Sequence, residues 1–264
     1  MKGRRIILTG ASEGIGRALA LELAARGARL ALAARDRDRL ESVAQECRAR
    51  GADALAVPTD VTNSQDLEWL VGETLKAFGG IDAVVHNAGI TMWSRFDALA
   101  DLSIFERVME VNYYAPVRLT ALTLPHLRES RGLIVVVASL AGLTGVPERS
   151  AYAGSKHAVI GFFDSLRIEL AGTGVDVSVV APDFVVTEIH KRAIGPDGEP
   201  LGTSPMQQSK LMTAPECARQ IARAMEKRQR QLLMSTRGKL GMWLKLLAPG
   251  IIDRIAAKAI RQRH

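Results

Sequence analysis

The feature that most constrains this chain is a regular alternation of short aliphatic runs with helical segments. Six runs rich in valine, isoleucine, leucine and alanine are separated by stretches with helical periodicity, and several of these stretches end at a glycine. Uninterrupted aliphatic runs are typical of strands buried on both faces, and helices between them supply the right-handed crossovers of a parallel sheet. The pattern predicts an α/β fold with a doubly wound parallel sheet and helices on both faces.

The expected elements follow from these runs. The predicted strands are residues 5–9, 29–34, 54–57, 83–86, 132–138 and 175–180. The predicted helices are residues 14–26, 36–50 and 64–78, one within 103–130, and one that carries residues 152 and 156. A single α/β domain often reaches this length, so residues 1–236 are expected to form one domain and residues 237–264 an extension. Residues 184–215 form a long insertion, and such insertions are often active-site lids.

A glycine-rich turn follows the first strand directly and opens the first helix. Glycine lets the backbone turn tightly and approach a pyrophosphate, whose charge the helix N-terminus favours. The glycine spacing alone is common, but its place between a strand and a helix predicts a nucleotide-binding loop. The residues of this loop are Gly10, Ser12, Glu13, Gly14, Ile15 and Gly16.

The end of the second strand discriminates between the two nicotinamide dinucleotides. Proteins that bind NAD usually place an acid there for the ribose hydroxyls, and this chain has Ala34 followed by Arg35. A guanidinium suits a phosphate monoester, so NADP(H) is predicted in preference to NAD(H). NAD(H) stays open because Asp36 is one residue further on and Glu13 adds negative charge to the glycine turn.

Two more strand ends supply candidate cofactor contacts. After the third strand, an acidic side chain is placed where it could hold the adenine amino group. After the fourth strand, an asparagine side chain can tie neighbouring strand ends together beside the cofactor. The residues at these two ends are Asp60, Val61, Asn87, Ala88 and Gly89.

Tyr152 and Lys156 are four residues apart in a segment with helical periodicity, so their side chains project from one helix face. A phenol beside an ammonium suggests an acid–base pair, because a nearby cation favours the phenolate form. A tyrosine in that setting can give a proton to a carbonyl oxygen or take one from an alcohol. The spacing therefore predicts carbonyl–alcohol chemistry at this helix.

Taken in order, these motifs resemble the short-chain dehydrogenase/reductase (SDR) family in its single-domain form. The resemblance covers residues 4–187. It implies a Rossmann-type fold, hydride transfer between a nicotinamide cofactor and a ketone or aldehyde, and a homodimer or homotetramer. By this resemblance, Tyr152 is the general acid/base and Lys156 favours its phenolate and binds the nicotinamide ribose. Ser139 is the hydroxyl that orients and polarises the substrate oxygen.

The resemblance also assigns roles further along the chain. Asn112 corresponds to the asparagine that anchors a water in the proton relay. Thr187 corresponds to the residue that binds the nicotinamide carboxamide, and Pro182 and Val185 lie in the same cofactor-binding segment. The chain departs from the family at Asp183, because the family usually has glycine after this proline. Asp183 could alter substrate binding, but a cap on the local turn is the favoured interpretation.

The expected substrate pocket is mostly apolar. Its elements are residues 90–100, residues 140–149 and the insertion, and they predict a hydrophobic or lipid-like carbonyl or alcohol substrate. Arg149 and Lys191 could meet an acid group, although solvated positions are the simpler interpretation. The apolar candidates are Met92, Trp93, Phe96, Leu143, Val146, Phe184, Ile189 and Ile194.

The net charge of +7 is concentrated at the C-terminus. Residues 237–264 contain seven Lys or Arg and one Asp, and the segment 240–262 has helical stretches with an apolar face and a basic face. Such a helix can make peripheral contact with an anionic membrane surface. The alternative is that its apolar face packs on the domain or on another subunit. Nucleic-acid binding is not expected, because basic and aromatic residues do not alternate as in a stacking groove.

The remaining sequence features concern the cellular compartment, metal binding and an alternative function. Cys47 and Cys217 are far apart and match no metal-ligand pattern, so we expect reduced thiols, no metal and a cytoplasmic protein. No signal peptide or run of ~18 apolar residues is visible. His86 lies in an apolar strand and is expected to be a core residue. A non-catalytic NADPH-binding regulator or scaffold remains the alternative function, and the set Ser139, Tyr152, Lys156 and Asn112 favours an enzyme.

Overall fold

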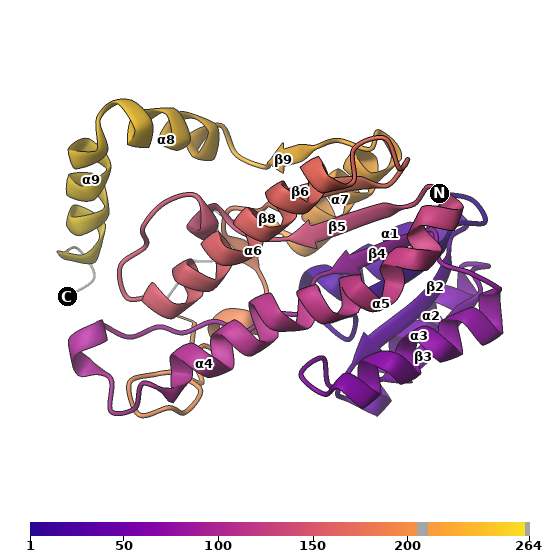
Figure 1. The fold of residues 1–264 in the computed structure, drawn as a ribbon. Coiled ribbons are helices and arrows are strands. Elements are labelled where there is room, and N and C mark those ends of the chain that lie inside the picture. Colours follow the sequence, from indigo (N-terminus) through magenta and orange to yellow (C-terminus); the bar gives the residue numbers. More distant parts are fainter. Residues whose placement is uncertain (205–210, 262–264) are drawn as a thin grey trace.

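The computed structural model describes residues 1–204 and 211–261 and shows a parallel sheet between two layers of helices (Figure 1). The strand order is β3-β2-β1-β4-β5-β6-β9, and every neighbouring pair is parallel. The predicted doubly wound sheet is therefore confirmed. The strands are β1 (Arg5–Thr9), β2 (Arg29–Ala34), β3 (Ala54–Pro58), β4 (Ala83–His86), β5 (Leu133–Val137), β6 (Asp176–Ala181) and β9 (Gln231–Leu233).

The helices alternate with these strands along the chain. Short one-turn helices are η1 (Phe96–Ala98), η3 (Leu140–Gly142) and η4 (Glu188–His190). A π-helical turn, η2 (Glu110–Tyr114), joins α4 (Ser103–Met109) to α5 (Ala115–Ser130). The other helices are α1 (Gly14–Ala25), α2 (Arg37–Ala49), α3 (Ser64–Phe78), α6 (Ser150–Glu169), α7 (Ala214–Glu226), α8 (Thr236–Leu247) and α9 (Pro249–Arg261).

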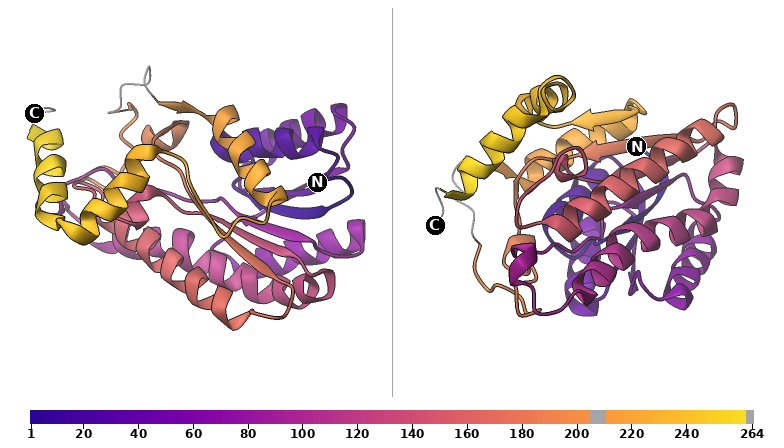
Figure 2. Two further views of the ribbon diagram at one scale, coloured as in Figure 1. Left: turned by 90° about the horizontal axis from the view of Figure 1, so that it is seen from above. Right: turned by 60° about the vertical axis from the view of Figure 1, so that its left-hand side comes forward.

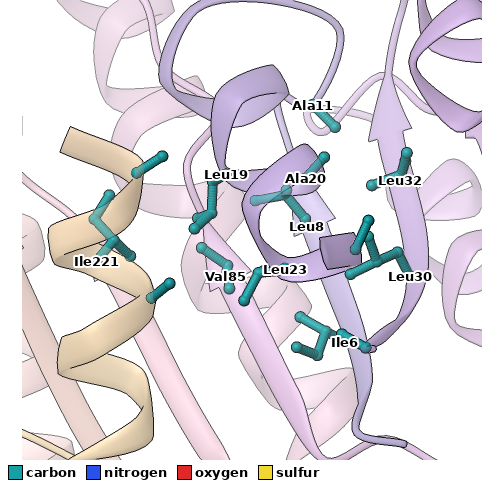
Figure 3. Close-up of a cluster of buried hydrophobic side chains, with 14 of the residues drawn as sticks. Ile6, Leu8, Ala11, Leu19, Ala20, Leu23, Leu30, Leu32, Val85 and Ile221 are labelled. Atoms are coloured by element: carbon teal, nitrogen blue, oxygen red, sulfur yellow. The ribbon is translucent and has the colours of Figure 1, made fainter. Parts of the chain in front are cut away.

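Successive residues of the central strands point into opposite helix layers. Ile6 and Leu8 of β1 pack with α1 and α7, as Figure 3 shows, and their cluster also contains residues of α2. Ile7 belongs to the cluster with α3, α5 and α6. All three side chains are fully buried. Burying an aliphatic side chain of this size stabilises the folded state by roughly 1.5–3 kcal/mol. The two-sided burial explains why the strands appear in the sequence as unbroken aliphatic runs.

Local residues fix the two ends of α3. Asn63 caps α3, because its side-chain oxygen accepts hydrogen bonds from the N–H groups of Gln65 and Asp66. The same helix ends at Gly79, whose φ of 74° lies in the left-handed region that glycine adopts without strain. The predicted boundaries of the first three helices and of all six strands agree with the structure to within one residue.

The features of the fold that were not predicted include a seventh strand and a break in a helix. The three-residue strand β9 pairs with β6 through Val179–Ala181 and adds a seventh strand at the edge of the sheet. The helix expected within residues 103–130 is interrupted by the π-helical turn, and Asn112 lies in that turn. Such insertions in a helix are frequent at functional sites.

The insertion and the C-terminal extension lie outside the sheet. In the insertion, β7 (Val185–Val186) pairs with β8 (Met212–Thr213), and residues 205–210 lie outside the described part. Helices α8 and α9 form an arm, residues 236–261, at the end of the molecule far from the N-terminus (Figure 2). Within the described ranges, no helix is long and apolar enough to cross a membrane.

Candidate active site

A cleft of about 1700 Å³ lies at the carboxyl ends of the strands. Ligands of open α/β sheets bind at this edge. The cleft brings together three of the four predicted catalytic residues, and Asn112 is buried behind its wall. It also contains every predicted cofactor residue, namely Gly10, Ser12, Glu13, Gly14, Ile15, Gly16, Arg35, Asp60, Val61, Asn87, Ala88, Gly89, Tyr152, Lys156, Pro182, Val185 and Thr187.

The glycine turn is packed so closely at Gly10 and Gly16 that neither position has room for a side chain. A Cβ on Gly16 would lie 2.0 Å from the carbonyl oxygen of Gly10, and one on Gly10 would lie 2.8 Å from the Cα of Ala88. Gly10 and Gly14 also have positive φ values. The turn therefore exposes backbone at the start of α1, next to the cleft. This shape fits the pyrophosphate of a dinucleotide.

Asn87 joins the ends of two neighbouring strands below the turn. Its side-chain Nδ2 donates to the carbonyl oxygens of Thr9 at 3.0 Å and Gly10 at 3.1 Å. Its backbone N–H, in turn, donates to the Thr9 hydroxyl at 3.0 Å. The structure thus shows the tie between strand ends that the sequence suggested, and this tie fixes the floor of the cleft.

The end of β2 presents basic side chains to the cleft. Ala34 is buried, Arg35 is exposed, and the carboxylate of Asp36 accepts the N–H of Arg39 as the cap of α2. Arg39 also pairs with Asp36 at 3.0 Å. Asp36, one of the two acids that left NAD(H) as an alternative cofactor, is therefore engaged with its own helix. Arg39 further lies 3.6 Å from Glu13 in the glycine turn.

Asp60 forms a tight turn before α3. Its Oδ1 accepts hydrogen bonds from the backbone N–H of Thr62 at 2.9 Å and from the Thr62 hydroxyl at 2.8 Å. The backbone N–H of Asp60 donates to Asp66 at 2.8 Å. Asp60 lines the cleft from this fixed position, and its contact with the adenine stays a prediction.

The reactive pair projects from α6, and both side chains are buried. The ammonium of Lys156 lies 5.7 Å from the centre of the Tyr152 ring and donates to the carbonyl oxygen of Val137 at 3.0 Å. Burial lowers the pKa of Lys156, and the negative charge that Tyr152 can carry opposes this effect. Ser139 lines the same cleft, and its Oγ accepts the N–H of Ala141 at 3.1 Å. Its hydroxyl proton can still be donated.

Asn112 holds the segment that follows β4. Its Oδ1 accepts the N–H of Ile90 and its Nδ2 donates to the Ile90 carbonyl, both at 2.9 Å. The Nδ2 also donates to Ser155 at 3.0 Å, and Ser155 donates to the Tyr152 carbonyl at 2.8 Å. The π-helical turn thus connects the wall of the cleft to the helix of the reactive tyrosine. The water-anchoring role of Asn112 stays a prediction.

Three further contacts fix the residues after Ile90. Thr91 Oγ1 accepts a hydrogen bond from Arg149 at 2.7 Å. The next residue, Met92, accepts the N–H of Ala151 through its sulfur at 3.3 Å, and the indole N–H of Trp93 donates to Glu148 at 2.9 Å. Four successive residues of this loop are therefore attached to α6, to the residues just before it, or to the π-helical turn.

The substrate end of the cleft agrees with the prediction only in part. Met92 is fully buried and Phe96 is 62% exposed on the surface, so neither lines the cleft and both predictions were wrong. Arg149 is only 5% exposed, which corrects the expectation that it is solvated. Lys191 does lie near solvent, where it pairs with Glu188 at 3.0 Å. The apolar candidates that line the cleft are Trp93, Leu143, Val146, Phe184, Ile189 and Ile194.

His190 is a cleft residue that the sequence did not indicate. It is buried, and its ring lies 6.2 Å from the rings of both Trp93 and Phe184. Burial, assisted by the nearby positive charge of Arg149, lowers the pKa of His190 to about 4. Its position depends on the path of the insertion, which no local pattern specifies.

Asp183 anchors the local chain and the C-terminal arm together. One carboxylate oxygen accepts the N–H of Phe184 at 3.0 Å, and the other accepts the Ser235 hydroxyl at 2.8 Å. Ser235 caps α8 by accepting the N–H of Gly238 at 3.0 Å. The role in the local turn agrees with the favoured interpretation, whereas the contact with the arm was not predicted.

Three further core residues take no part in the cleft. His86 is buried against Phe163, and its Nε2 lies 2.9 Å from the Thr120 hydroxyl, so its expected core position is confirmed. Cys47 and Cys217 are free, buried thiols, and burial raises their pKa values to about 11 and about 12. Among the described residues, no group of histidine, cysteine and acidic side chains is arranged to hold a metal ion.

Comparisons with known proteins agree with this geometry. The short chain dehydrogenase family matches residues 4–195. The 11-beta-hydroxysteroid dehydrogenase 1A of Arabidopsis thaliana is 34% identical over 258 residues, which cover 95% of this chain and 74% of the relative. A short-chain dehydrogenase/reductase from Burkholderia phymatum, solved with NAD, has a TM-score of 0.84 at 26% identity and covers 95% of each chain. An alcohol dehydrogenase from Thermococcus sibiricus, solved with 5-hydroxy-NADP, has a TM-score of 0.75 at 28% identity and covers 87% of this chain and 93% of that one.

Proposed function

This chain belongs to the short-chain dehydrogenase/reductase family, and from that premise we propose that it interconverts a hydrophobic ketone or aldehyde and its alcohol with NADP(H). The observation that carries the proposal is the shared cleft. Ser139, Tyr152 and Lys156 line the same cleft as the glycine turn, which fits a dinucleotide. One end of the cleft thus has side chains that can transfer a proton, and the other end has a backbone shape that fits the cofactor.

Tyr152, Ser139 and Lys156 have different roles at the substrate oxygen. When bound, the reduced nicotinamide supplies a hydride to the carbonyl carbon. The Tyr152 phenol gives its proton to the carbonyl oxygen, and the Ser139 hydroxyl donates a hydrogen bond to that oxygen as it gains negative charge. Lys156 stays beside the phenol because Val137 holds its ammonium, and its charge favours the phenolate that remains. In the reverse direction, the phenolate accepts the proton of the alcohol.

The preference for NADP(H) rests on the basic end of β2. Arg35 and Arg39 both line the cleft, and Asp36 is engaged as a helix cap. A guanidinium suits a phosphate monoester such as the 2′-phosphate. Arg35→Ala should raise KM for NADPH more than KM for NADH. Arg37→Ala, which removes an exposed arginine outside the cleft, is the matched control and should leave the ratio unchanged.

The substrate class rests on the lining of the cleft. Trp93, Phe184 and Ile194 contribute apolar surface there, and so do Leu244 and Ile252 of the arm. A pocket with this lining favours a lipid-like molecule with few polar groups. A relative whose name includes a hydroxysteroid supports a steroid or another lipid ketone as the first class to test.

The decisive experiment measures NADPH and NADH oxidation against carbonyls from small diketones to long-chain 3-keto lipids and ketosteroids. Tyr152→Phe should lower kcat by roughly 10²–10⁴-fold, because it removes the proton donor, and should leave NADPH binding nearly unchanged. Wild-type turnover that persists in Tyr152→Phe would contradict the assignment. Tight NADPH binding without any turnover across the panel would favour the non-catalytic regulator.

We also propose that the arm contacts the inner, cytoplasmic surface of an anionic membrane, from which a lipid substrate enters the cleft. Leu247 is 82% exposed and Leu240 is 70% exposed, and Trp243 and Leu246 are exposed beside them. Residues 237–264 carry most of the net positive charge of the chain, which complements anionic lipids. The side chains of Arg237, Lys239 and residues 258–261, and all of residues 262–264, lie outside the described part.

Co-sedimentation with vesicles tests this contact in the full-length protein. Leu240→Glu/Leu247→Glu should reduce binding to vesicles that contain phosphatidylserine. Trp69→Glu, which alters an exposed apolar residue on α3, is the matched control and should bind like wild type. Equal pelleting of all three proteins would contradict membrane contact, and equal binding to vesicles of phosphatidylcholine alone would contradict the role of charge.

The assembly we propose is a homodimer or homotetramer formed by α4, α5 and α6. Ile168 on α6 is exposed, and Tyr114, at the junction with α5, is also exposed. Large apolar groups on neighbouring helices are suited to an isologous interface. Light scattering should give a multiple of the 28.5 kDa chain mass, and Ile168→Glu should lower it. A wild-type mass equal to one chain would contradict the assembly.

A further inference from the structure

Arg149 is an unusual neighbour for the reactive tyrosine. Its guanidinium carbon lies 4.7 Å from the centre of the Tyr152 ring and 5.0 Å from the Trp93 ring. The side chain is 5% exposed and donates to Thr91 at 2.7 Å. A buried arginine is therefore in contact with the ring that the proposed mechanism uses, although the mechanism assigns it no role.

We propose that Arg149 is a positioning residue that orients the Tyr152 ring and, as a second cation beside Lys156, favours its phenolate form. This inference rests on the function proposed above. A cation close to an aromatic face is attracted by the ring, and the attraction is stronger where water is excluded. Arg149 acts through Tyr152 and the loop at Thr91.

The two cations near the Tyr152 ring differ in character. Burial lowers the pKa of Lys156, whereas an arginine stays charged throughout the working range of pH. Arg149 thus provides the charge that does not vary with pH. Its contact with Thr91 also fixes where this charge lies, because a guanidinium holds its donors in a rigid plane.

Other titratable and charged groups also face this end of the cleft. His190 is neutral above its pKa of about 4, and the carboxylate of Glu148 accepts the indole N–H of Trp93. Asp183 is bonded to Phe184 and Ser235. On the side of α4 and the π-helical turn, the charged residues that line the cleft are Arg107 and Glu110.

Two variants separate charge from packing. Arg149→Met keeps the length and apolar body of the side chain without its charge, and Arg149→Lys restores a charge without the planar contact. Arg128→Met removes an exposed arginine from α5, outside the cleft, and controls for the loss of one positive charge. Thermal melting and NADPH binding show whether each variant is folded.

The first readout is the pH profile of alcohol oxidation, which needs the phenolate. In Arg149→Met, the pH of half-maximal kcat/KM should rise by about one unit, and kcat at neutral pH should fall roughly tenfold. Arg149→Lys should lie between Arg149→Met and wild type, and Arg128→Met should match wild type. A folded Arg149→Met with the wild-type profile would overturn the proposal, as would a loss of kcat with an unmoved profile.

The second readout needs no substrate and so separates this proposal from the proposed function. The chain has three tyrosines, and subtracting the ultraviolet absorbance of Tyr152→Phe isolates the tyrosinate signal of Tyr152. The midpoint of that signal should be about one pH unit higher in Arg149→Met than in the parent protein. Coincident midpoints would overturn the role of Arg149 even if the enzyme proves active. A shifted midpoint without turnover would uphold this role and reject only the reaction.

Discussion

The sheet beneath the cleft and the C-terminal arm beside it differ in how their apolar residues are used. Along β1, Ile6, Ile7 and Leu8 are fully buried between two helix layers. In the arm, Leu247 and Leu240 remain largely exposed, and hydrogen bonds attach the arm to the rest of the chain. Lys245 donates to the Leu143 carbonyl at 2.7 Å, and Asp183 accepts the Ser235 hydroxyl.

The difference shows that apolar residues are used in two ways around one cleft. The sheet buries its own apolar surface and so supplies the free energy of folding. The arm contributes Leu244, Ile252 and Ile255 to the cleft while it leaves other apolar groups outside. Exposed apolar groups in a continuous patch mark interaction surfaces. The sheet therefore positions the reactive residues, and the arm adds apolar surface to the cleft that they line.

The largest contrast in stability is expected from two glycines. In Gly16→Ala, the new Cβ meets the backbone oxygen of Gly10 at 2.0 Å, and backbone cannot move aside cheaply. We expect a loss of about 3 kcal/mol or more and of NADPH binding. In Gly241→Ala, the new Cβ meets nothing within 4 Å in α8, and the helix should gain about 0.5–1 kcal/mol. Chemical denaturation would measure both, and similar losses would show that the arm is packed as tightly as the turn.

Two leucines provide the next contrast. Leu8→Ala empties a fully buried site between β1 and the helices and should cost about 2–5 kcal/mol. Leu247→Ala alters a side chain that is 82% exposed and should change stability by less than about 0.5 kcal/mol. Urea unfolding of the two variants tests the pair. A cost above that limit for Leu247→Ala would mean that the arm is covered, for instance by another subunit.

The pH dependence of stability should originate in the sheet. Burial lowers the pKa of His86 to about 3, while a histidine in the unfolded chain has a pKa near 6.5. The unfolded state therefore binds more protons below about pH 6.5, and stability should fall by up to about 1.4 kcal/mol per pH unit as the pH drops toward 3. His190, with its pKa of about 4, adds to the loss of stability at pH values between about 4 and 6.5.

Urea unfolding at pH 7, 6 and 5 would measure this slope. In His86→Asn, the contribution of His86 disappears, so the variant should lose less stability between pH 7 and pH 5 than wild type. A slope identical to wild type would mean that His86 can take up a proton in the folded protein, or that other groups set the acid sensitivity.

The smallest expected effect concerns the attachment of the arm. Ser235→Ala removes the cap of α8 and its hydrogen bond to Asp183, and should destabilise that helix by about 1 kcal/mol. Amide hydrogen exchange should quicken in α8 and stay unchanged in the sheet. Thr236→Ala, one residue further on, is the matched control. Faster exchange throughout the sheet would show that the arm and the sheet unfold together.

Much of the fold was predictable because its signals are local. Glycine at Gly10 and Gly16 and the unbroken aliphatic strands each act over a few residues. In a parallel sheet, consecutive strand ends meet at one edge, so the glycine turn and the segment after β4 had to lie close together. The helical spacing of Tyr152 and Lys156 placed both on one face of α6 in the same way.

The remainder depends on contacts between residues far apart in the chain. Arg149 is buried because Thr91, Trp93 and Tyr152 surround it, and no sequence period signals that arrangement. Phe96 was predicted to line the cleft but is exposed, and His190 lines the cleft without having been predicted. Both outcomes also depend on contacts between distant parts of the chain. Strand β9 is too short for its residues to show a pattern before β6 pairs with it.

The sequence by itself thus determined six strands of the sheet, the helices between them and the residue types of the reactive pair, because periodicity and backbone preference act locally. Only the tertiary structure decided which side chains surround the Tyr152 ring and how the arm meets the cleft. These depend on shape and long-range packing, such as the 2.8 Å hydrogen bond from Ser235 to Asp183 across 52 residues. Contacts of that kind form when distant segments are brought together, and the free energy of burying the sheet brings them there.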